Sequence, residues 1–526
     1  MSTSTSSITQ TAIAMGLYLL IVIVVGIVFA KRANENSDNF FLGGRSLGPW
    51  VAAMSAEASD MSGWLLMGLP GVAYWCGIAD AFWTAIGLLI GTYLNWLLVS
   101  KRLRRYSTYT KSITLPEFFS NRFREKGKLR PLLIIASLFI LVFFAVYVGS
   151  CFATAGKLFA QLFNAPYIPM MLLGAVIVIF YTLLGGFLAE SVSDFIQGII
   201  MIVALVAVLA IGIWHAGGVG AIRDNLKNIP GFMDFFGIAS PATGGDGIQL
   251  IESGKPLFGE AGKYGLLTIV STMSWGLGYF GMPQVLLRFF AIRKLSELRR
   301  SRIIATVWCT ISLAAAVVIG IVGRAGFATN SELLTSGGAE GVFITIASTL
   351  FHPLVAGVMM AGILAAVMSS SDSYLLIASS ALAKDIFKGV IKKDATDKNI
   401  MLVSRIALML VAVFGVVIAW NKDSNIFKIV SFAWAGFGAA FGPLVLFSLF
   451  WKRLTHIGAV AGTLAGGIMV FVWKFLIKPN GGVWGIYELL PAFLVSCIVI
   501  VVVSLVTAKP SAEVQGDFEA AKTFEC

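Results

Sequence analysis

The sequence predicts an all-α polytopic membrane protein, and its composition is the first reason. Hydrophobic residues fill 58% of the 526 positions, while charged residues fill only 13%. Soluble domains carry about a quarter of charged residues, roughly twice that share. The mean hydropathy is +0.87. A chain of this composition lacks the polar surface that a water-soluble fold needs, whereas lipid can cover its apolar surface.

The length and number of the apolar segments are the second reason. About 13 segments of roughly 20 residues each are expected to cross the bilayer as helices. The expected spans are 10–30, 49–71, 79–100, 131–160, 167–186, 192–215, 264–290, 303–323, 343–380, 401–420, 426–451, 456–477 and 487–507. The chain divides into an N-terminal extra span and loop (1–48), a central core (49–451), and two C-terminal spans with a short tail (452–526).

The distribution of basic residues sets the expected orientation. The net charge of +12 gathers in short loops such as 101–130 and 291–302, on one side of the predicted topology. The positive-inside rule places these loops in the cytoplasm. The N-terminus is then outside and the C-terminus cytoplasmic, in the cell (inner) membrane. The lipid bilayer is the expected surrounding, and neither nucleic acid nor an obligatory protein partner is expected.

Two of the expected spans are interrupted by polar or helix-breaking residues. In MSAEASDMSGW (54–64), Glu57 and Asp60 stand among serines, and carboxylates in lipid are costly unless they face protein or water. In STMSWGLGYFGMPQ (271–284), Pro283 removes a helix hydrogen bond and three glycines let the chain turn. Both helices are expected to unwind there and expose backbone carbonyl groups. The two interruptions lie five spans apart, as in an inverted repeat.

A third polar cluster, SSSDS, occupies residues 369–373 of an otherwise apolar span. Ser369, Asp372 and Ser373 share a helix face by their spacing, and Ser370 lies one position round. A single serine in a membrane helix more often bonds back to its own helix, whereas an intramembrane carboxylate favours a functional role. Hydroxyl and carbonyl oxygens with few formal charges suit a hard monovalent cation, which points to sodium.

The residues also indicate the kind of solute that is transported with the cation. The positive end of a broken helix suits an anionic group, and Trp275 and Tyr279 offer walls for an apolar or ring-shaped body. The residues alone predict a cation-coupled carrier of a small organic solute. A proton-coupled carrier that uses Asp60, Asp194 or Asp372 remains an alternative. A sensor would need a signalling module and an enzyme would need a nucleophile–base or metal cluster, so no enzymatic activity is expected.

Three segments resemble signatures of the sodium/solute symporter family, most closely its sodium/proline branch. They are SDMSGWLLMGLPG (59–71), WGLGYFGMPQVLLRF (275–289) and AAVMSSSDSYLL (365–376). The resemblance implies a LeuT-like five-plus-five inverted repeat within the transport core, with repeats at about 49–215 and 264–451. It implies sodium-coupled import of L-proline by alternating access. The alternative is a sodium- or proton-coupled carrier of another small amino acid or monocarboxylate.

The same resemblance implies a set of site residues. Sodium would be bound by the backbone carbonyls of Ala58, Met61 and Ala366 and the hydroxyls of Ser369 and Ser370, with Asp60 organising the site. The substrate would contact Ser62, Gly63, Trp64, Tyr147, Trp275, Tyr279 and Pro283. A second cation site would use Asp194, Ser369, Asp372 and Ser373, while Arg45 and Ser55 would influence coupling. Asp372 departs from the family pattern, in which a serine is typical.

Overall fold

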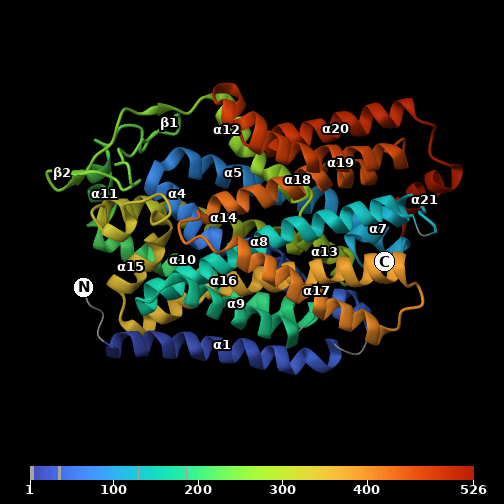
Figure 1. Cartoon of the computed structure of the whole chain (residues 1–526), viewed down its shortest axis with the longest axis horizontal. Coiled ribbons are helices and arrows are strands. Elements are labelled where there is room, and N and C mark those ends of the chain that lie inside the picture. Colours follow the sequence, from blue (N-terminus) through green and yellow to red (C-terminus); the bar gives the residue numbers. More distant parts are fainter. Residues whose placement is uncertain (1–4, 34–36, 128, 185, 526) are drawn as a thin grey trace.

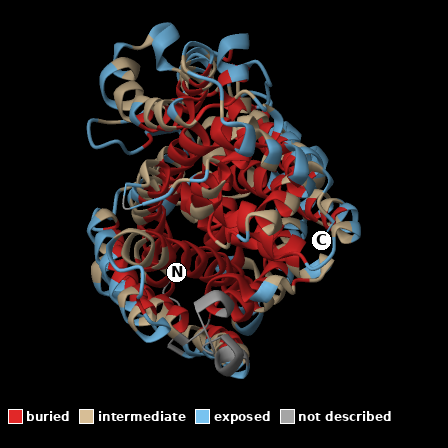
Figure 2. Cartoon of the chain, turned by 90° about the vertical axis from the view of Figure 1, so that its right-hand side faces the viewer, coloured by how far each residue is buried: buried red, intermediate tan, exposed pale blue. Residues whose placement is uncertain are grey.

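The structure, a computed structural model, describes residues 5–33, 37–127, 129–184 and 186–525. Figure 1 shows long helices lying side by side along the longest axis, with the N-terminus at one end of the bundle and the C-terminus towards the other. Figure 2 shows that buried segments fill the middle of the bundle. Within the described residues, ten helices are long and apolar enough to cross a membrane. This finding confirms a multi-pass membrane protein, and 13 spans remain a prediction.

Most of the chain lies in helices. The longer ones are α1 (Thr5–Ala33), α5 (Ile78–Leu94), α8 (Pro131–Phe163), α9 (Tyr167–Leu184), α10 (Phe187–His215), α14 (Leu298–Gly326), α16 (Pro353–Ser380), α17 (Asp397–Ile418), α18 (Ile426–Phe450), α19 (His456–Val472) and α20 (Leu489–Val506). The shorter ones are α2 (Ser37–Leu42), α3 (Pro49–Asp60), α4 (Leu69–Cys76), α6 (Ser100–Tyr109), α7 (Leu115–Arg122), α11 (Gly218–Leu226), α12 (Leu266–Met273), α13 (Pro283–Ala291), α15 (Val342–Leu350) and α21 (Ala512–Thr523). Proline opens α3, α8, α13 and α16, where its missing N–H has no helical partner to lose.

The first predicted interruption is confirmed. Helix α3 ends at Asp60, and Met61 takes non-helical angles (φ −82°, ψ 65°). A π-helical turn, Trp64–Gly68, then leads into α4. A Cβ on Gly63 would lie 2.3 Å from Cγ2 of Thr154 in α8. Glycine is required at this position because α8 packs directly against the interruption.

The second predicted interruption is also confirmed. A 3-10 turn, Ser274–Phe280, separates α12 from α13, and Pro283 begins α13. The turn packs backbone to backbone on α5, since a Cβ on Gly91 would lie 2.3 Å from the carbonyl oxygen of Gly276. Side-chain-free glycines on both elements make this approach feasible.

Several expected boundaries were wrong. The span 343–380 consists of two helices, because α15 ends at Leu350 and Pro353 starts α16 after an extended His352 (φ −57°, ψ 141°). The apolar helix Tyr167–Leu183 is shorter than the ten long ones, and it ends before the expected boundary at 186.

Three segments expected as polar loops carry their own structure. Helix α6 begins at Ser100 and α7 follows it, so both lie in the segment expected as the loop 101–130. Helix α21 forms in the tail. The segment 216–263 contains α11 and two antiparallel pairs of two-residue strands, β1 (Gly237–Ile238) with β4 (Gly262–Lys263) and β2 (Ile251–Glu252) with β3 (Lys255–Pro256). Figure 1 places α7 and α21 at one end of the bundle and the strands at the other. The end with α6, α7 and α21 is called the basic end below.

Helix α3 and its interruption lie at the centre of the helix packing. Helix α3 packs against α10, α13, α14 and α16, and α16 packs in turn against α8 and α10. Every residue from Ala52 to Gly71 is buried. The polar residues of the interruption are therefore surrounded by protein and not by lipid, as the cost of intramembrane charge requires.

Candidate functional site

The interruption after α3 lies against the polar cluster of α16. The Ser369 hydroxyl donates to the Ala58 carbonyl oxygen at 2.8 Å and lies 3.3 Å from the Ala366 carbonyl oxygen. The Ser370 hydroxyl lies 3.4 Å from the same Ala58 oxygen. The structure thus brings four of the five predicted sodium ligands together in a buried position. A serine hydrogen can rotate away, so these four oxygens can all face a cation.

The fifth predicted ligand, Met61, is the first non-helical residue of the interruption. Its amide donates to the Glu57 carbonyl at 2.8 Å, which closes the last turn of α3. The carbonyl groups beyond that turn lack the regular helical partners that a continuous helix would provide. The Met61 carbonyl therefore lies in the unwound segment, directly after the last turn of α3 that contains Ala58.

Two buried carboxylates flank the interruption. The amide nitrogen Nε2 of Gln284 donates to Oδ1 of Asp60 at 3.1 Å, which ties the first interruption to the start of α13. The indole Nε1 of Trp96 donates to Oε1 of Glu57 at 3.3 Å. Asp60 joins the two broken helices and makes no contact with Ser369 among the described hydrogen bonds, which fits an organising role better than direct ligation.

The predicted substrate residues lie around the two interruptions. The ring centroids of Trp64 and Trp275 are 6.1 Å apart. Trp275 also stacks on Tyr487 at 5.1 Å, and its carbonyl accepts a hydrogen bond of 2.8 Å from Nε1 of Trp434. These contacts make Trp275 a fixed wall, supported from behind by α18 and by the segment before α20.

Four predicted substrate residues carry buried polar atoms that have no partner within the described part of the chain. They are Ser62 Oγ, Trp64 Nε1, Tyr147 OH and Tyr279 OH. Buried polar atoms in proteins are normally hydrogen-bonded, because an unmade bond costs free energy. Their concentration at two helix interruptions fits a site that binds a small polar molecule. Pro283 differs from the others, since it serves as the first residue of α13.

The residues predicted for a second cation site are held by an arginine. Nη2 of Arg288 donates to Asp194 Oδ2 at 3.1 Å and to Ser373 Oγ at 2.8 Å, and it also pairs with Glu190. Ser369 faces the other side, towards Ala58. The guanidinium therefore occupies the position between Asp194 and Ser373 where the resemblance suggests an ion.

The two residues predicted to influence coupling both lie where helices meet near the basic end. Ser55 donates to Asp194 at 2.7 Å and accepts from Nε of Arg288 at 2.9 Å. Arg45 donates to the carbonyl oxygens of Phe290 and Ser112 at 2.8 Å and 2.7 Å. Ser55, which lies in α3, therefore connects α3 to α10 and α13. Arg45 connects α13 to the segment between α6 and α7.

The sequence interpretation missed Arg288 and Glu190. An arginine in VLLRFF, inside an apolar span, is itself a functional signal at membrane depth. Glu190 was placed outside its span, which was expected to begin at 192. Helix α10 begins at Phe187, so Glu190 lies in its first turn.

The structure combines a helix bundle with two interrupted helices. Oxygen atoms and buried unpaired polar groups gather at these interruptions. This is the architecture of a secondary transporter. The chain belongs to the sodium:solute symporter family, whose profile matches residues 40–466. Sodium is its coupling ion, and the family is one of transporters and not of enzymes.

Individual relatives and solved structures agree with this assignment. A sodium/proline symporter of Staphylococcus aureus (strain USA300 / TCH1516) is 41% identical over 515 residues, which cover 97% of this chain and 95% of that protein. A similar match, also 41% identical, is a sodium/proline symporter of Staphylococcus aureus (strain COL). A substrate-bound, outward-open Na+-coupled sialic acid symporter superposes with a TM-score of 0.76 at 20% identity, over 95% of this chain and 99% of that one. At this identity the structural likeness establishes the fold.

Proposed function

We propose that the protein imports L-proline together with sodium by alternating access. The observation that carries the proposal is the contact between the interruption after α3 and the hydroxyls of Ser369 and Ser370. Curated relatives that share 41% identity over nearly the full length are named sodium/proline symporters. The unpaired polar atoms beside Trp64 and Trp275 suit a zwitterion with a small apolar ring.

The proposed sodium site explains how the ion organises the substrate site. Sodium bound by Ala58, Met61, Ala366, Ser369 and Ser370 would join α3 to α16. The next residues of the interruption are Ser62, Gly63 and Trp64, which are proposed to contact the substrate. Fixing the interruption therefore orders substrate groups, and by linkage the substrate strengthens sodium binding to the same extent.

The membrane potential supplies part of the driving force. One sodium moving inward gains about 2.3 kcal/mol per 100 mV. That free energy supports accumulation of a neutral zwitterion on the order of 50-fold, before any sodium gradient is added. Coupling requires that the ion and the solute cross only together. In the proposed arrangement both bind at the same interruption, so that each depends on the other.

We propose the following arrangement for the remaining parts of the chain. The transport core, 49–451, contains a LeuT-like pair of inverted repeats at about 49–215 and 264–451. The first span with its loop (1–48) and the last two spans with the tail (452–526) flank it, for 13 spans in all. The basic end faces the cytoplasm of a cell whose inner membrane holds the protein, with the N-terminus outside. The interruptions in the second and seventh expected spans support this pairing.

Uptake of radiolabelled L-proline into proteoliposomes tests the proposal. An inward sodium gradient is compared with potassium or choline, for wild type and Ser369→Ala. We expect sodium-dependent accumulation that the substitution strongly reduces. Proline accumulation that ignores sodium but follows a pH gradient would contradict sodium coupling at this site.

The alternative substrate class is tested in the same vesicles. If sodium alters the tryptophan fluorescence of the protein but L-proline is not accumulated, a panel of other small amino acids and monocarboxylates is assayed. Accumulation of one of these with sodium would replace proline and keep the mechanism. The two buried tryptophans at the interruptions, Trp64 and Trp275, give this fluorescence readout a structural basis.

A further inference from the structure

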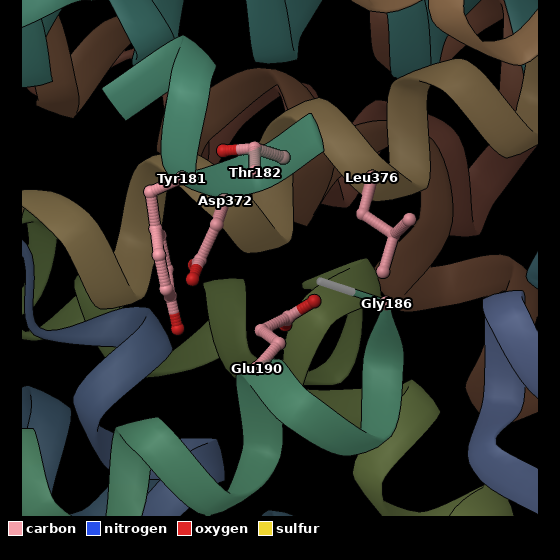
Figure 3. A pocket seen from close by; sticks show the side chains of 6 residues that line it. All are labelled: Tyr181, Thr182, Gly186, Glu190, Asp372 and Leu376. Atoms are coloured by element: carbon pink, nitrogen blue, oxygen red, sulfur yellow. The ribbon is translucent and has the colours of Figure 1, made fainter. Parts of the chain in front are cut away.

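Two hollows in the described part of the molecule differ in size and in lining. The smaller one, of about 10 Å³, is lined by Tyr181, Glu190 and Asp372 among others, and Figure 3 shows both carboxylates turned towards it. It belongs to the polar network around Arg288 described above and has room for one water-sized particle. The larger one encloses about 680 Å³, within the range of about 300–1,000 Å³ that is usual for sites of organic ligands.

The larger hollow is an apolar groove on the surface of the bundle, called the α18 groove below. Leu98 and Phe450, which line it, are each 42% exposed. The lining carries no charged side chain, so hydrocarbon suits it best. The lining residues come from the turn before α6, from the end of α18 and from α20; they are Leu98, Leu446, Phe447, Phe450, Trp451 and Val501.

Basic residues stand at one end of the α18 groove. Lys101 and Arg102 follow Leu98 by three and four positions, which places them on the same side of the continuing helix. The α18 wall continues into Lys452, which pairs with Glu519 at 3.2 Å. None of the described ion pairs involves Lys101 or Arg102. The positive charge of these two side chains is therefore not balanced by a carboxylate of the described chain.

Arg102 connects the basic end of the groove to its apolar wall. Its Cζ lies 4.4 Å from the ring centroid of Phe450, and Nη1 donates to the Leu449 carbonyl oxygen at 2.9 Å. A guanidinium has five N–H groups, and the described hydrogen bonds of Arg102 use only Nη1. The N–H groups of Nε and Nη2 lie on one edge of the guanidinium and match two oxygens of a phosphate group.

We propose that the α18 groove binds one anionic phospholipid of the phosphatidylglycerol type, from the leaflet at the basic end. An acyl chain fills the apolar groove, and the phosphate accepts hydrogen bonds from Arg102, with Lys101 beside it. Basic residues next to an apolar gap between membrane helices are complementary to an anionic headgroup. A phosphatidylethanolamine offers the same chains, but its amine opposes the charge of the basic residues. The bound lipid joins α6 to α18 and α20.

Native mass spectrometry of the full chain, purified in detergent, tests this proposal. Phosphatidylglycerol and phosphatidylethanolamine with the same acyl chains are titrated separately. We expect one phosphatidylglycerol per chain, bound about tenfold more tightly than phosphatidylethanolamine, because two basic side chains favour the anionic headgroup. Arg102→Gln should raise the dissociation constant of phosphatidylglycerol about tenfold, since charge-assisted hydrogen bonds to the phosphate are lost.

Arg302→Gln is the matched control. Arg302 also lies over a partly exposed aromatic ring, that of Tyr93 at 5.4 Å, but it does not line the α18 groove. The substitution should leave the dissociation constant of phosphatidylglycerol unchanged.

Val501→Phe tests the apolar half of the site. The larger side chain fills part of the groove and keeps every charge, so it should also weaken the binding of phosphatidylglycerol. Because it leaves the bond between Arg102 and Leu449 in place, this variant keeps the test valid if Arg102→Gln fails to fold.

Three outcomes would overturn the lipid site. Equal affinity for the two lipids would show that the basic residues do not select a headgroup. Equal losses in Arg102→Gln and Arg302→Gln would show that lipid covers the surface without a defined site. A lipid-free dimer that Val501→Phe dissociates would assign the groove to a second copy of the chain. The measurement uses neither sodium nor L-proline, so its failure leaves the proposed transport function to be tested by uptake alone.

Discussion

The Ser369 hydroxyl and the Ala58 carbonyl oxygen lie 311 positions apart in the sequence and 2.8 Å apart in space. The contact joins the unwound end of α3 to the middle of α16. A cation at this point replaces one hydrogen bond with several oxygen ligands. The sodium site proposed here would therefore join α3 to α16, and this contact is the basis of the first prediction.

Ser369→Ala should raise the sodium concentration for half-maximal uptake about 10- to 100-fold. A polar contact to a charged group is worth about 1.5–3 kcal/mol, and 1.4 kcal/mol corresponds to a factor of ten. Ser371→Ala is the matched control, because the Ser371 hydroxyl bonds back to the Val367 carbonyl of its own helix. Sodium titration of proline uptake measures both. Equal effects in the two variants would contradict the assigned role of Ser369.

Tyr279→Phe should reduce substrate affinity without reducing stability. The Tyr279 hydroxyl is buried and has no partner in the described part of the chain, so its removal breaks no internal hydrogen bond. Tyr74→Phe is the control with the opposite profile, since the Tyr74 hydroxyl donates to the Phe327 carbonyl at 3.1 Å. It should lower the melting temperature and spare substrate affinity. Thermal unfolding and proline binding, measured on the same preparations, distinguish the two.

Gly63→Ala should abolish uptake through a steric effect. The added Cβ would lie 2.3 Å from Cγ2 and 2.4 Å from Oγ1 of Thr154, so α8 would have to move away from the interruption. Adding Thr154→Gly removes these atoms and should recover part of the activity. The four-variant cycle of uptake rates measures the coupling. Additive losses would show that Gly63 is needed for another reason.

Arg288→Gln should destabilise the protein by about 3–5 kcal/mol, because it leaves buried carboxylates without their partner. Arg293→Gln is the control, because it shows whether the loss of any arginine in this segment lowers the stability. Arg293 pairs with Glu297 at 2.8 Å on the surface, with a side chain that is 54% exposed, and exposed pairs contribute about 0–1 kcal/mol. Thermal unfolding in detergent compares the two. A small effect of Arg288→Gln would mean that the carboxylates are neutral without it.

The docking of the C-terminal helix α21 should weaken in acid. Arg124 donates to Asp517 at 2.6 Å and Tyr109 donates to it at 2.8 Å, and the guanidinium holds the pKa of Asp517 below its usual range. A carboxyl with a lowered pKa stabilises the folded arrangement above its ordinary value of about 3.9 and loses that contribution as pH falls further. Faster hydrogen exchange in residues 512–523 is therefore expected below about pH 4.

Two variants define this prediction further. Asp517→Asn should exchange faster at neutral pH and lose most of the acid dependence. Glu513→Gln should change little, because the Glu513 side chain is 71% exposed and its pair with Arg124 is screened by solvent and salt. Acid-dependent exchange that survives in Asp517→Asn would assign the effect to another group.

The interruptions could be predicted because they are local. Pro283 cannot donate a backbone hydrogen bond wherever the rest of the chain lies. The need for glycine at 63, by contrast, comes from the packing of Thr154 in α8. The same kind of signal was available at Pro353, which begins a new helix, yet the continuous hydrophobicity of 343–380 hid it. Boundary errors had consequences as well, since a start at 192 instead of Phe187 removed Glu190 from its helix.

By itself the sequence determined the membrane class, the two broken helices and the polar residues of the site, because hydrophobicity, proline, glycine and buried charge act through the chain nearest to them. Only the tertiary structure decided which of those residues meet. Arg288 reaches Asp194 across 94 positions, and this contact fills the place predicted for an ion. Whether a carboxylate faces a guanidinium or a small cavity depends on how α9, α10, α13 and α16 pack, and helix packing depends on side chains far apart in the sequence.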